Sequence, residues 1–166
     1  MPDSIDEQLV RLLGQDGRQS SETLAKQLNL SAATVRRRLR KLIRSKLLHI
    51  TGAVDPAKFG FPLAVVIALD ISNDKLESAM EELVNQPEIT WISITTGRFD
   101  IIALARFPST EALSKFLAKE LIRIEGVKDS ETFICLDIKK GHYVSLTLTS
   151  DGNSGHQTFH AAKSPA

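Results

Sequence analysis

Apolar residues recur at helical spacing along the first 50 residues, and this pattern predicts three helices. Ser4 and Ser31 are predicted to cap the first and third helices, because a serine hydroxyl can accept from an unpaired backbone amide. The second helix begins after Ser20 or Ser21, and only Asn29-Leu30 separates it from the third cap. Two short helices joined by so short a turn form a helix-turn-helix. The inward residues are Ile5, Leu9, Leu12 and Leu13, then Leu24, Ala25 and Leu28, then Val35, Leu39, Leu42 and Ile43.

The pattern changes after Lys46. Residues 47–54 alternate loosely between apolar and polar positions, which predicts a strand or a short wing. Asp55-Pro56 then begins a turn. We therefore expect residues 1–50 to form a winged helix-turn-helix domain and residues 51–60 to form a hinge strand and linker.

Residues 61–149 repeat one theme, in which a strand is followed by a helix and a second strand. The β-α-β-β-α-β order predicts a ferredoxin-like domain, so the fold class is α+β: an N-terminal winged helix-turn-helix followed by a ferredoxin-like βαββαβ domain. Gly97-Arg98 is predicted to form a tight turn between antiparallel strands. The predicted strands are Leu63–Ile71, Ile89–Thr96, Phe99–Phe107 and Val127–Ile138. The two helices have Asn73 and Ser109 as caps, with Leu76, Met80, Leu83 and Val84, then Leu113, Phe116, Leu117 and Ile124, inward.

Both helices cover one face of such a sheet, and the other face needs its own cover. Dimerisation through that face is the simplest solution, with Trp91 either in the core or in the interface. Cys135 is expected to lie in the core of a strand. His142–Thr149 could add an edge strand, and the polar residues 150–166 are predicted to be a flexible tail.

Charge is distributed unevenly along the 166 residues. Residues 1–50 contain ten Lys or Arg and five Asp or Glu, a net charge of +5, whereas the remainder carries −4. Between Arg36 and Lys46 there are seven cations and no anion. The cationic side chains on such a helix repel one another, and a polyanionic partner would relieve this repulsion. The charge distribution therefore indicates a polyanionic partner for the N-terminal domain alone.

The third helix is therefore predicted to bind double-stranded DNA, with its N-terminal half in the major groove. Arginine suits guanine because its guanidinium donates two hydrogen bonds to O6 and N7. The candidates for base contacts are Ala33, Thr34, Arg36 and Arg37, and the helix N-terminus at Ser31 is a candidate for phosphate contact. The candidates for phosphate contacts along the helix are Arg38, Arg40, Lys41, Arg44 and Lys46. The alternative is a plain three-helix bundle whose cationic face is only solvated.

Composition indicates an ordinary cytoplasmic protein, with 42% hydrophobic and 25% charged residues. No apolar run approaches the roughly 20 residues of a membrane span, and the N-terminus does not read as an export signal. A single cysteine fits a reducing compartment. No metal or cofactor is expected, since His156 and His160 lack the intervening glutamate of a zinc-protease motif.

The chain resembles the leucine-responsive/asparagine-responsive (Lrp/AsnC) transcription regulators over about residues 3–140. In the N-terminal domain the matching residues are Ile5-Asp6, Leu9 and Leu12, then Leu30-Ser31, Thr34-Val35, Arg38 and Leu42. In the second domain the match is Gly97, Phe99 and Asp100 within GRFDI. Lys46 stands where the family has a glycine, so a left-handed helix cap there would be strained or rearranged.

The resemblance implies a homodimer, a higher oligomer such as an octamer, and a small effector, often an amino acid, bound near the GRFDI turn. Glycine lets backbone approach a ligand, and Asp100 could pair with an α-ammonium group. Thr132 is included because it faces this region in the family pattern. The candidate effector residues are Thr96, Gly97, Arg98, Phe99, Asp100 and Thr132. A plain hairpin turn with a structural aspartate fits the same residues.

We interpret the chain as a sequence-specific DNA-binding transcription regulator that responds to a metabolite, and not as an enzyme. Two alternatives remain open. Proteins of the same architecture resemble siroheme decarboxylases, whose chemistry would need histidine and arginine clusters; here Arg98, Arg106 and Arg123 are scattered. An effector-independent DNA-packaging protein would instead show a flat sequence preference.

Overall fold

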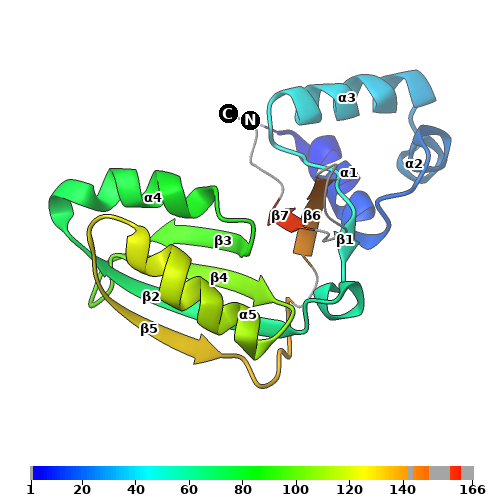
Figure 1. Cartoon of the computed structure of the whole chain (residues 1–166). Coiled ribbons are helices and arrows are strands. Elements are labelled where there is room, and N and C mark those ends of the chain that lie inside the picture. Colours follow the sequence, from blue (N-terminus) through cyan, green and yellow to red (C-terminus); the bar gives the residue numbers. More distant parts are fainter. Residues whose placement is uncertain (1, 142–143, 150–157, 162–166) are drawn as a thin grey trace. The chain divides into compact units, whose positions relative to one another are not determined.

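The computed structural model of the chain describes residues 2–141, 144–149 and 158–161 (Figure 1). The chain divides into two units, Met1–Thr51 and Gly52–Ala166, which we call the head and the body. Each unit has its own hydrophobic core. Among the described residues, no helix combines the length and the apolar character that crossing a membrane requires.

The head consists of three helices, α1 (Ser4–Gln15), α2 (Ser21–Leu28) and α3 (Ala32–Arg44). Ser20 and Ser31 cap α2 and α3 as predicted, and each accepts from the amide three residues further on. The predicted cap by Ser4 is wrong. Asp3 caps α1 instead: its carboxylate accepts from the amide of Asp6, and the Asp6 carboxylate accepts from the amide of Asp3 in return.

A three-residue turn joins α2 to α3 and completes the predicted helix-turn-helix. Asn29 adopts the left-handed conformation there, with φ 53°, which asparagine tolerates better than most residues. The prediction that Ile43 points inward is wrong, because its side chain is 46% exposed. The core of the head consists of Leu9, Leu13, Leu24, Ala25 and Val35, with Leu12, Leu28, Leu39 and Leu48 among the residues packed against it.

The predicted wing is wrong for residues 47–52, which contain no strand. Lys46 is in the left-handed conformation, with φ 58°, so the cap is strained in the way the sequence indicates. The amides of Leu47 and Leu48 then turn back and donate to the carbonyl of Leu42. Amides that close a helix end in this way cannot also form a strand ladder. The segment yields only the short strand β1 (Ala53–Val54).

The body contains the predicted ferredoxin-like sheet. Its strand order is β3-β4-β2-β5, and every neighbouring pair is antiparallel. The strands are β2 (Leu63–Ile71), β3 (Ile89–Ile94), β4 (Ile101–Phe107) and β5 (Val127–Ile134). The helices are α4 (Leu76–Val84) and α5 (Thr110–Lys115). Single helical turns lie at η1 (Pro56–Phe59), η2 (Asn73–Lys75), η3 (Phe116–Glu120) and η4 (Leu121–Arg123).

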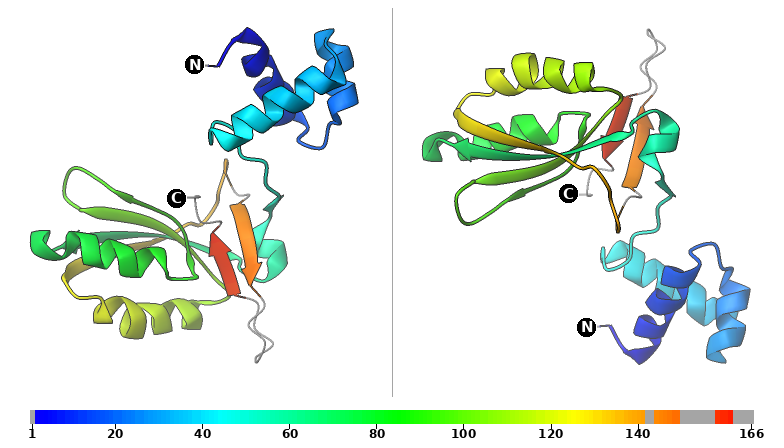
Figure 2. Two further views of the ribbon diagram at one scale, coloured as in Figure 1. Left: turned by 90° about the horizontal axis from the view of Figure 1, so that it is seen from above. Right: turned by 90° about the horizontal axis from the view of Figure 1, so that it is seen from below.

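The core of the body lies between the sheet and its two helices, which run along the same face (Figure 2). Alternate residues of the central strands meet there, since Ile67 pairs with Ala103 and both are buried. Leu83 of α4 and Leu113 of α5 belong to the same cluster. Ser109 caps α5 as predicted, by accepting from the amide of Ala112.

Several predicted boundaries in the body are wrong. Asn73 begins the turn η2 and does not cap α4, which starts at Leu76 without a side-chain cap. Val84, the last residue of α4, is 47% exposed. β3 and β4 are shorter than predicted, because residues 95–100 form a loop between them. β5 ends at Ile134, so Cys135 lies beyond the strand and is only partly buried.

A second sheet has the strand order β1-β6-β7, where β6 is Val144–Thr149 and β7 is Thr158–Ala161. The predicted strand at His142–Thr149 is therefore present as β6, but it pairs with β1 and β7 rather than with the four-stranded sheet. Most of the predicted flexible tail, 150–157 and 162–166, lies outside the described residues, as does His156. The prediction is wrong for β7, whose backbone pairs with β6.

Candidate nucleic-acid interface and effector loop

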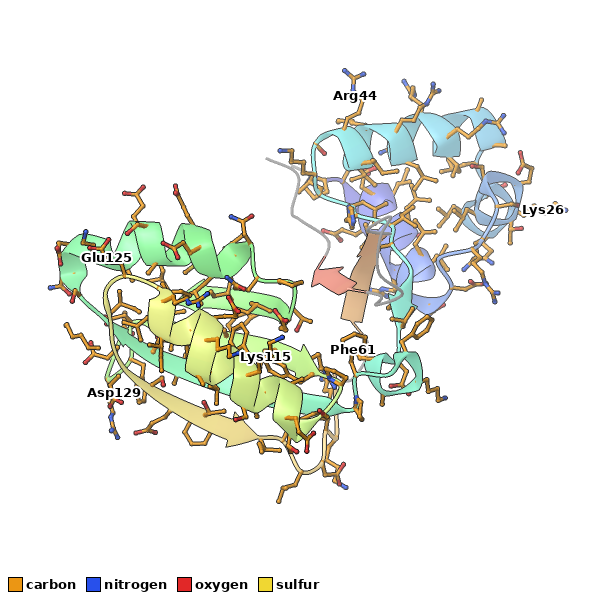
Figure 3. The ribbon with its side chains drawn as sticks, viewed as in Figure 1. Lys26, Arg44, Phe61, Lys115, Glu125 and Asp129 are labelled. Atoms are coloured by element: carbon orange, nitrogen blue, oxygen red, sulfur yellow. The ribbon has the colours of Figure 1, made fainter. Side chains whose placement is uncertain are left out.

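One face of α3 is cationic and exposed. Its side chains recur at i, i+3, i+4 and i+7, so they form one row about 10 Å long. Val35 and Leu42 bury the opposite side of the helix. None of the cations in the row has a carboxylate within salt-bridge distance in the part of the chain that is described. We call this set the cationic row: Arg37, Arg40, Lys41 and Arg44, which with Ser45 line a shallow hollow. Figure 3 shows Arg44 directed away from the rest of the head.

The N-terminal turn of α3 presents polar groups beside this row. The Ser31 hydroxyl accepts from the amide of Thr34 and lies 2.9 Å from the Thr34 hydroxyl. Ala33 is exposed. Arg36 is also exposed, but its Nη1 donates to Glu22 of α2 at 2.7 Å. This pair engages one of the guanidinium nitrogens of Arg36.

Arg38 does not lie on the exposed face. Its Nη1 donates to Oδ2 of Asp3 at 2.7 Å and to Oδ1 of Asp6 at 2.8 Å, and its side chain is only 23% exposed. The two carboxylates raise the pKa of Arg38, with Asp3 the larger cause. Both partners belong to the head itself, so they hold the Arg38 guanidinium away from the exposed cationic face.

The candidate effector loop, residues 95–100, joins β3 to β4. The amide and hydroxyl of Thr95 donate to the carbonyls of Asp100 and Phe99, which closes the loop. Gly97 has φ 122°, a conformation that glycine adopts without strain, and no atom lies within 4 Å of where its Cβ would be. The backbone at Gly97 is therefore open to a ligand. Thr95, whose hydrogen bonds close the loop, is a residue that the sequence pattern does not indicate.

Arg98 and Asp100 have different surroundings in this loop. The Arg98 guanidinium lies 5.0 Å from the centre of the Phe99 ring and 2.6 Å from the carboxylate of Glu131 on β5. Asp100 is bound to β2 instead: its amide donates to the carbonyl of Leu69, and its Oδ2 accepts from the amide of Ile71. Asp100 thus has the structural role that the hairpin interpretation requires.

Thr132 is not brought to this loop within one chain. It pairs with the buried Ile67, so its side chain lies on the face of the sheet that the helices cover. Its neighbour Glu131 points to the opposite face and meets Arg98. The sequence pattern therefore missed Glu131, and only the strand register reveals it.

The face of the sheet away from the helices carries an apolar row that crosses all four strands. Trp91 pairs with Leu104, Leu104 with Val66, and Val66 with Phe133. Trp91, Leu104 and Phe133 are 50%, 41% and 51% exposed. Arg106 lies on the same face and is half-buried, and this burial lowers its pKa. We call Trp91, Leu104, Val66 and Phe133 the apolar row.

The described residues contain no group of three or more histidine, cysteine, aspartate or glutamate side chains that could hold a metal ion. Arg98, Arg106 and Arg123 lie in a loop, on β4 and in η4, on separate elements of the body.

Comparison with known proteins gives matches to both parts of the chain. The model of the AsnC-type helix-turn-helix domain matches residues 3–43, and that of the Lrp/AsnC ligand binding domain matches residues 64–145. An uncharacterized HTH-type transcriptional regulator of Pyrococcus abyssi is 32% identical over 145 residues, which cover 87% of this chain and 92% of that protein.

Solved structures share the fold. Escherichia coli AsnC superposes with a TM-score of 0.80 at 24% identity, covering 85% of this chain and 96% of its own. A Neisseria meningitidis transcriptional regulator in complex with L-methionine gives a TM-score of 0.79 at 24% identity, over 85% of this chain and 94% of its own.

Proposed function

The chain belongs to the Lrp/AsnC family of HTH-type transcriptional regulators, and we propose that it reads an operator with α3, as a homodimer that responds to an amino acid. The cationic row carries this proposal. Four cations on one exposed helix face, without carboxylate partners among the described residues, form a surface that duplex phosphates would neutralise. The activity we propose is regulatory and not enzymatic.

Within the head, the side chains divide by position along α3. We propose that Ala33, Thr34, Arg36 and Arg37 meet base edges, since the N-terminal part of a recognition helix enters the major groove. Arg40, Lys41 and Arg44 would hold phosphates, and the α3 N-terminus at Ser31 would bind a further phosphate. Arg36 would leave Glu22 as it does so.

The apolar row supports a dimer that is formed by the body. Four side chains in direct cross-strand register form a continuous apolar band, and a second copy packed face to face would cover it. A symmetric dimer would present two copies of α3 to two half-sites of an operator. We propose that such dimers assemble further, with an octamer as the expected form.

The effector site is proposed at the loop 95–100. The matched family domain is a ligand-binding domain, and one fold neighbour is in complex with L-methionine. An amino acid carries a carboxylate and an ammonium group, which the paired Arg98 and Glu131 would match one for one. The other residues of the proposed site in the loop are Thr96, Gly97 and Phe99, and Asp100 holds the loop against β2. Thr132 lies on the other face of the sheet, so it would take part only in a site shared with another chain.

Selection of genomic fragments by the purified protein, with and without each of the twenty amino acids, tests the DNA half of the proposal. We expect enrichment of a two-fold symmetric sequence, and a change in occupancy with at least one amino acid. Retention of every fragment equally would favour the packaging protein. Retention of none at low ionic strength would overturn DNA binding.

Titration calorimetry with the same amino acids tests the effector site. We expect heat from at least one amino acid, a loss of that heat in Arg98→Ala, and no loss in Lys119→Ala, which removes an exposed cation from η3. Equal heats from both variants would place the ligand elsewhere. Sedimentation with and without the active amino acid would show whether the ligand changes the oligomer.

A further inference from the structure

Arg38 joins two segments of the head that are 32 to 35 residues apart in the sequence. A single nitrogen, Nη1, donates to the cap residue of α1, Asp3, and to Asp6 in the first turn of that helix. Asp3 and Asp6 are already joined to each other through the capping box. The N-terminus of α1 and the middle of α3 are therefore tied by one charged network.

The network lies at the edge of the apolar core. Asp6 is 4% exposed and is the only buried charged residue among those described. The Nε of Arg38 is also buried and has no hydrogen-bond partner in the described part of the chain. A buried carboxylate needs a partner of opposite charge. Arg38 must therefore stay near Asp6, and this fixes how α3 lies across α1.

We propose that Arg38 is a positioning residue for DNA recognition, which sets α3 against α1 through Asp6 and Asp3 and does not contact phosphate. This inference rests on the proposed function, since it concerns the aim of the same helix. It assigns a role to two acidic residues in a domain whose partner is a polyanion. Removal of an acidic charge would ordinarily strengthen DNA binding, whereas removal of Asp6 is expected to weaken it.

The head provides a matched pair for comparison. Arg36 also pairs with a carboxylate, Glu22, but both side chains are more than half exposed. Glu22→Gln and Asp6→Asn make the same change of charge next to an arginine of α3. They differ in that Arg38 is mostly buried whereas Arg36 lies on the surface, and in that Asp6 also accepts from the amide of Asp3.

The test measures binding of the full chain to its selected operator and to a random duplex, over a range of salt concentrations. We expect Asp6→Asn to weaken operator binding about tenfold, which is within the range of coupling energies in one charged network, while binding to the random duplex is not weakened. Glu22→Gln is expected to strengthen binding to both. If Asp6→Asn strengthened operator binding as Glu22→Gln does, the positioning role would be overturned.

Arg38→Met separates positioning from phosphate contact. A lost phosphate contact lowers the salt slope of log affinity by about 0.9 per site. A positioning residue leaves the slope on the random duplex unchanged and reduces only the preference for the operator. A slope reduced by about one per protomer on both duplexes would return Arg38 to the phosphate contacts.

Asp3→Asn keeps the inference testable if Asp6→Asn unfolds the head. Asparagine caps helices as well as aspartate does, so this variant retains the cap and removes only one charge next to Arg38. We expect a threefold or smaller loss of operator affinity, by analogy with other charge pairs at partly exposed sites, and unchanged helical circular dichroism. A gain in operator affinity would contradict the proposal. Failure of the wild-type chain to bind any duplex would instead overturn the proposed function itself.

Discussion

The head and the body each expose a surface that no other described residue of the same unit neutralises or covers. One surface is cationic and the other is apolar. In the head this surface is the cationic row, which lies on the side of α3 that does not pack into the core of the head. In the body it is the apolar row on the sheet, beside a large core on the other face. A cationic surface attracts a polyanion, and salt screens that attraction. An exposed apolar surface is stabilised by packing against another apolar surface, and salt does not screen this interaction. The two contacts proposed for these surfaces, with DNA and with a second copy, should therefore respond differently to solution conditions.

Salt should separate them most strongly. With four cations on each copy of α3, a bound dimer that makes roughly six to ten phosphate contacts would lose about 10³ to 10⁵ in affinity between about 50 and 200 mM salt. The dimer itself should keep its dissociation constant. Fluorescence anisotropy on labelled operator and sedimentation of free protein, in the same buffers, measure the two. Parallel losses would mean that the body surface is also electrostatic.

A charge placed in the apolar row should break the body contact and leave the head intact. Leu104 has Val66 and Trp91 as its direct neighbours. Leu104→Asp would bury an unpaired carboxylate in the proposed interface, which should weaken the dimer about a thousandfold, or roughly 4 kcal/mol. The matched control is Val84→Asp, at a similarly exposed position on α4.

Sedimentation gives the mass, and the emission of Trp91 gives a local reading, since it is the only tryptophan in the chain. Its side chain is half-exposed in a single chain, so emission should move to longer wavelength in Leu104→Asp. A dimer that survives this substitution would show that another face forms the contact.

Much of the fold could be predicted because local chemistry decides it. A continuous apolar run predicts β2 with its observed ends, and serine side chains at 20, 31 and 109 predict three of the caps. The cap of α1 is predicted at Ser4 and found at Asp3, because both residue types cap and each has an acidic residue three positions later, Glu7 after Ser4 and Asp6 after Asp3.

The site was predicted less completely, because tertiary pairing decides it. Seven cations in one short segment indicate DNA, but the sequence does not show that Arg38 pairs with Asp3 and Asp6, which lie 35 and 32 residues away. The strand register likewise determines that Glu131, and not Thr132, faces the effector loop. The apolar row is predicted as an uncovered face but not by its members, because the central strands carry apolar residues on both faces and only the register assigns Val66 and Leu104 to the open one.

Within the head, substitution of Arg37 should have a smaller effect than added salt has on DNA binding or Leu104→Asp has on the dimer. Arg37→Ala should cost about 1–3 kcal/mol on the operator and relax the preference at one base position, if its guanidinium reads a guanine. Lys115→Ala, which removes an exposed cation from α5, should leave binding unchanged. Selection repeated with each variant reports the preference. An Arg37→Ala protein with unaltered preference and affinity would exclude this residue from base contact.

The two units also differ in how they form left-handed turns. Among the described residues, the positive φ angles of the head belong to Asn29 and Lys46, whereas those of the body all belong to glycine. Lys46→Gly should therefore stabilise the head by about 1 kcal/mol, since lysine is strained in that conformation. Asn29→Gly should gain less. Urea unfolding followed by helical circular dichroism compares the variants, and equal gains would show that the strain at Lys46 is already relieved.

Acid should have the smallest effect, and in the head it acts at low pH through Asp3. The amide of Asp6 and then the guanidinium of Arg38 lower the pKa of Asp3. A carboxylate with a lowered pKa in the folded state stabilises that state fully above its unfolded pKa of about 4, and this contribution is lost as the pH falls through the lower, folded value. Asp3→Asn keeps the cap without the titration. The variant should thus be less stable than wild type at pH 7, and this difference should shrink below about pH 4. Helical circular dichroism follows the unfolding of the chain. Emission from Trp91 reports the body, and it should change equally in both proteins. A difference that persisted unchanged at pH 2 would mean that it does not arise from the charge of Asp3, and that this charge contributes nothing to holding Arg38.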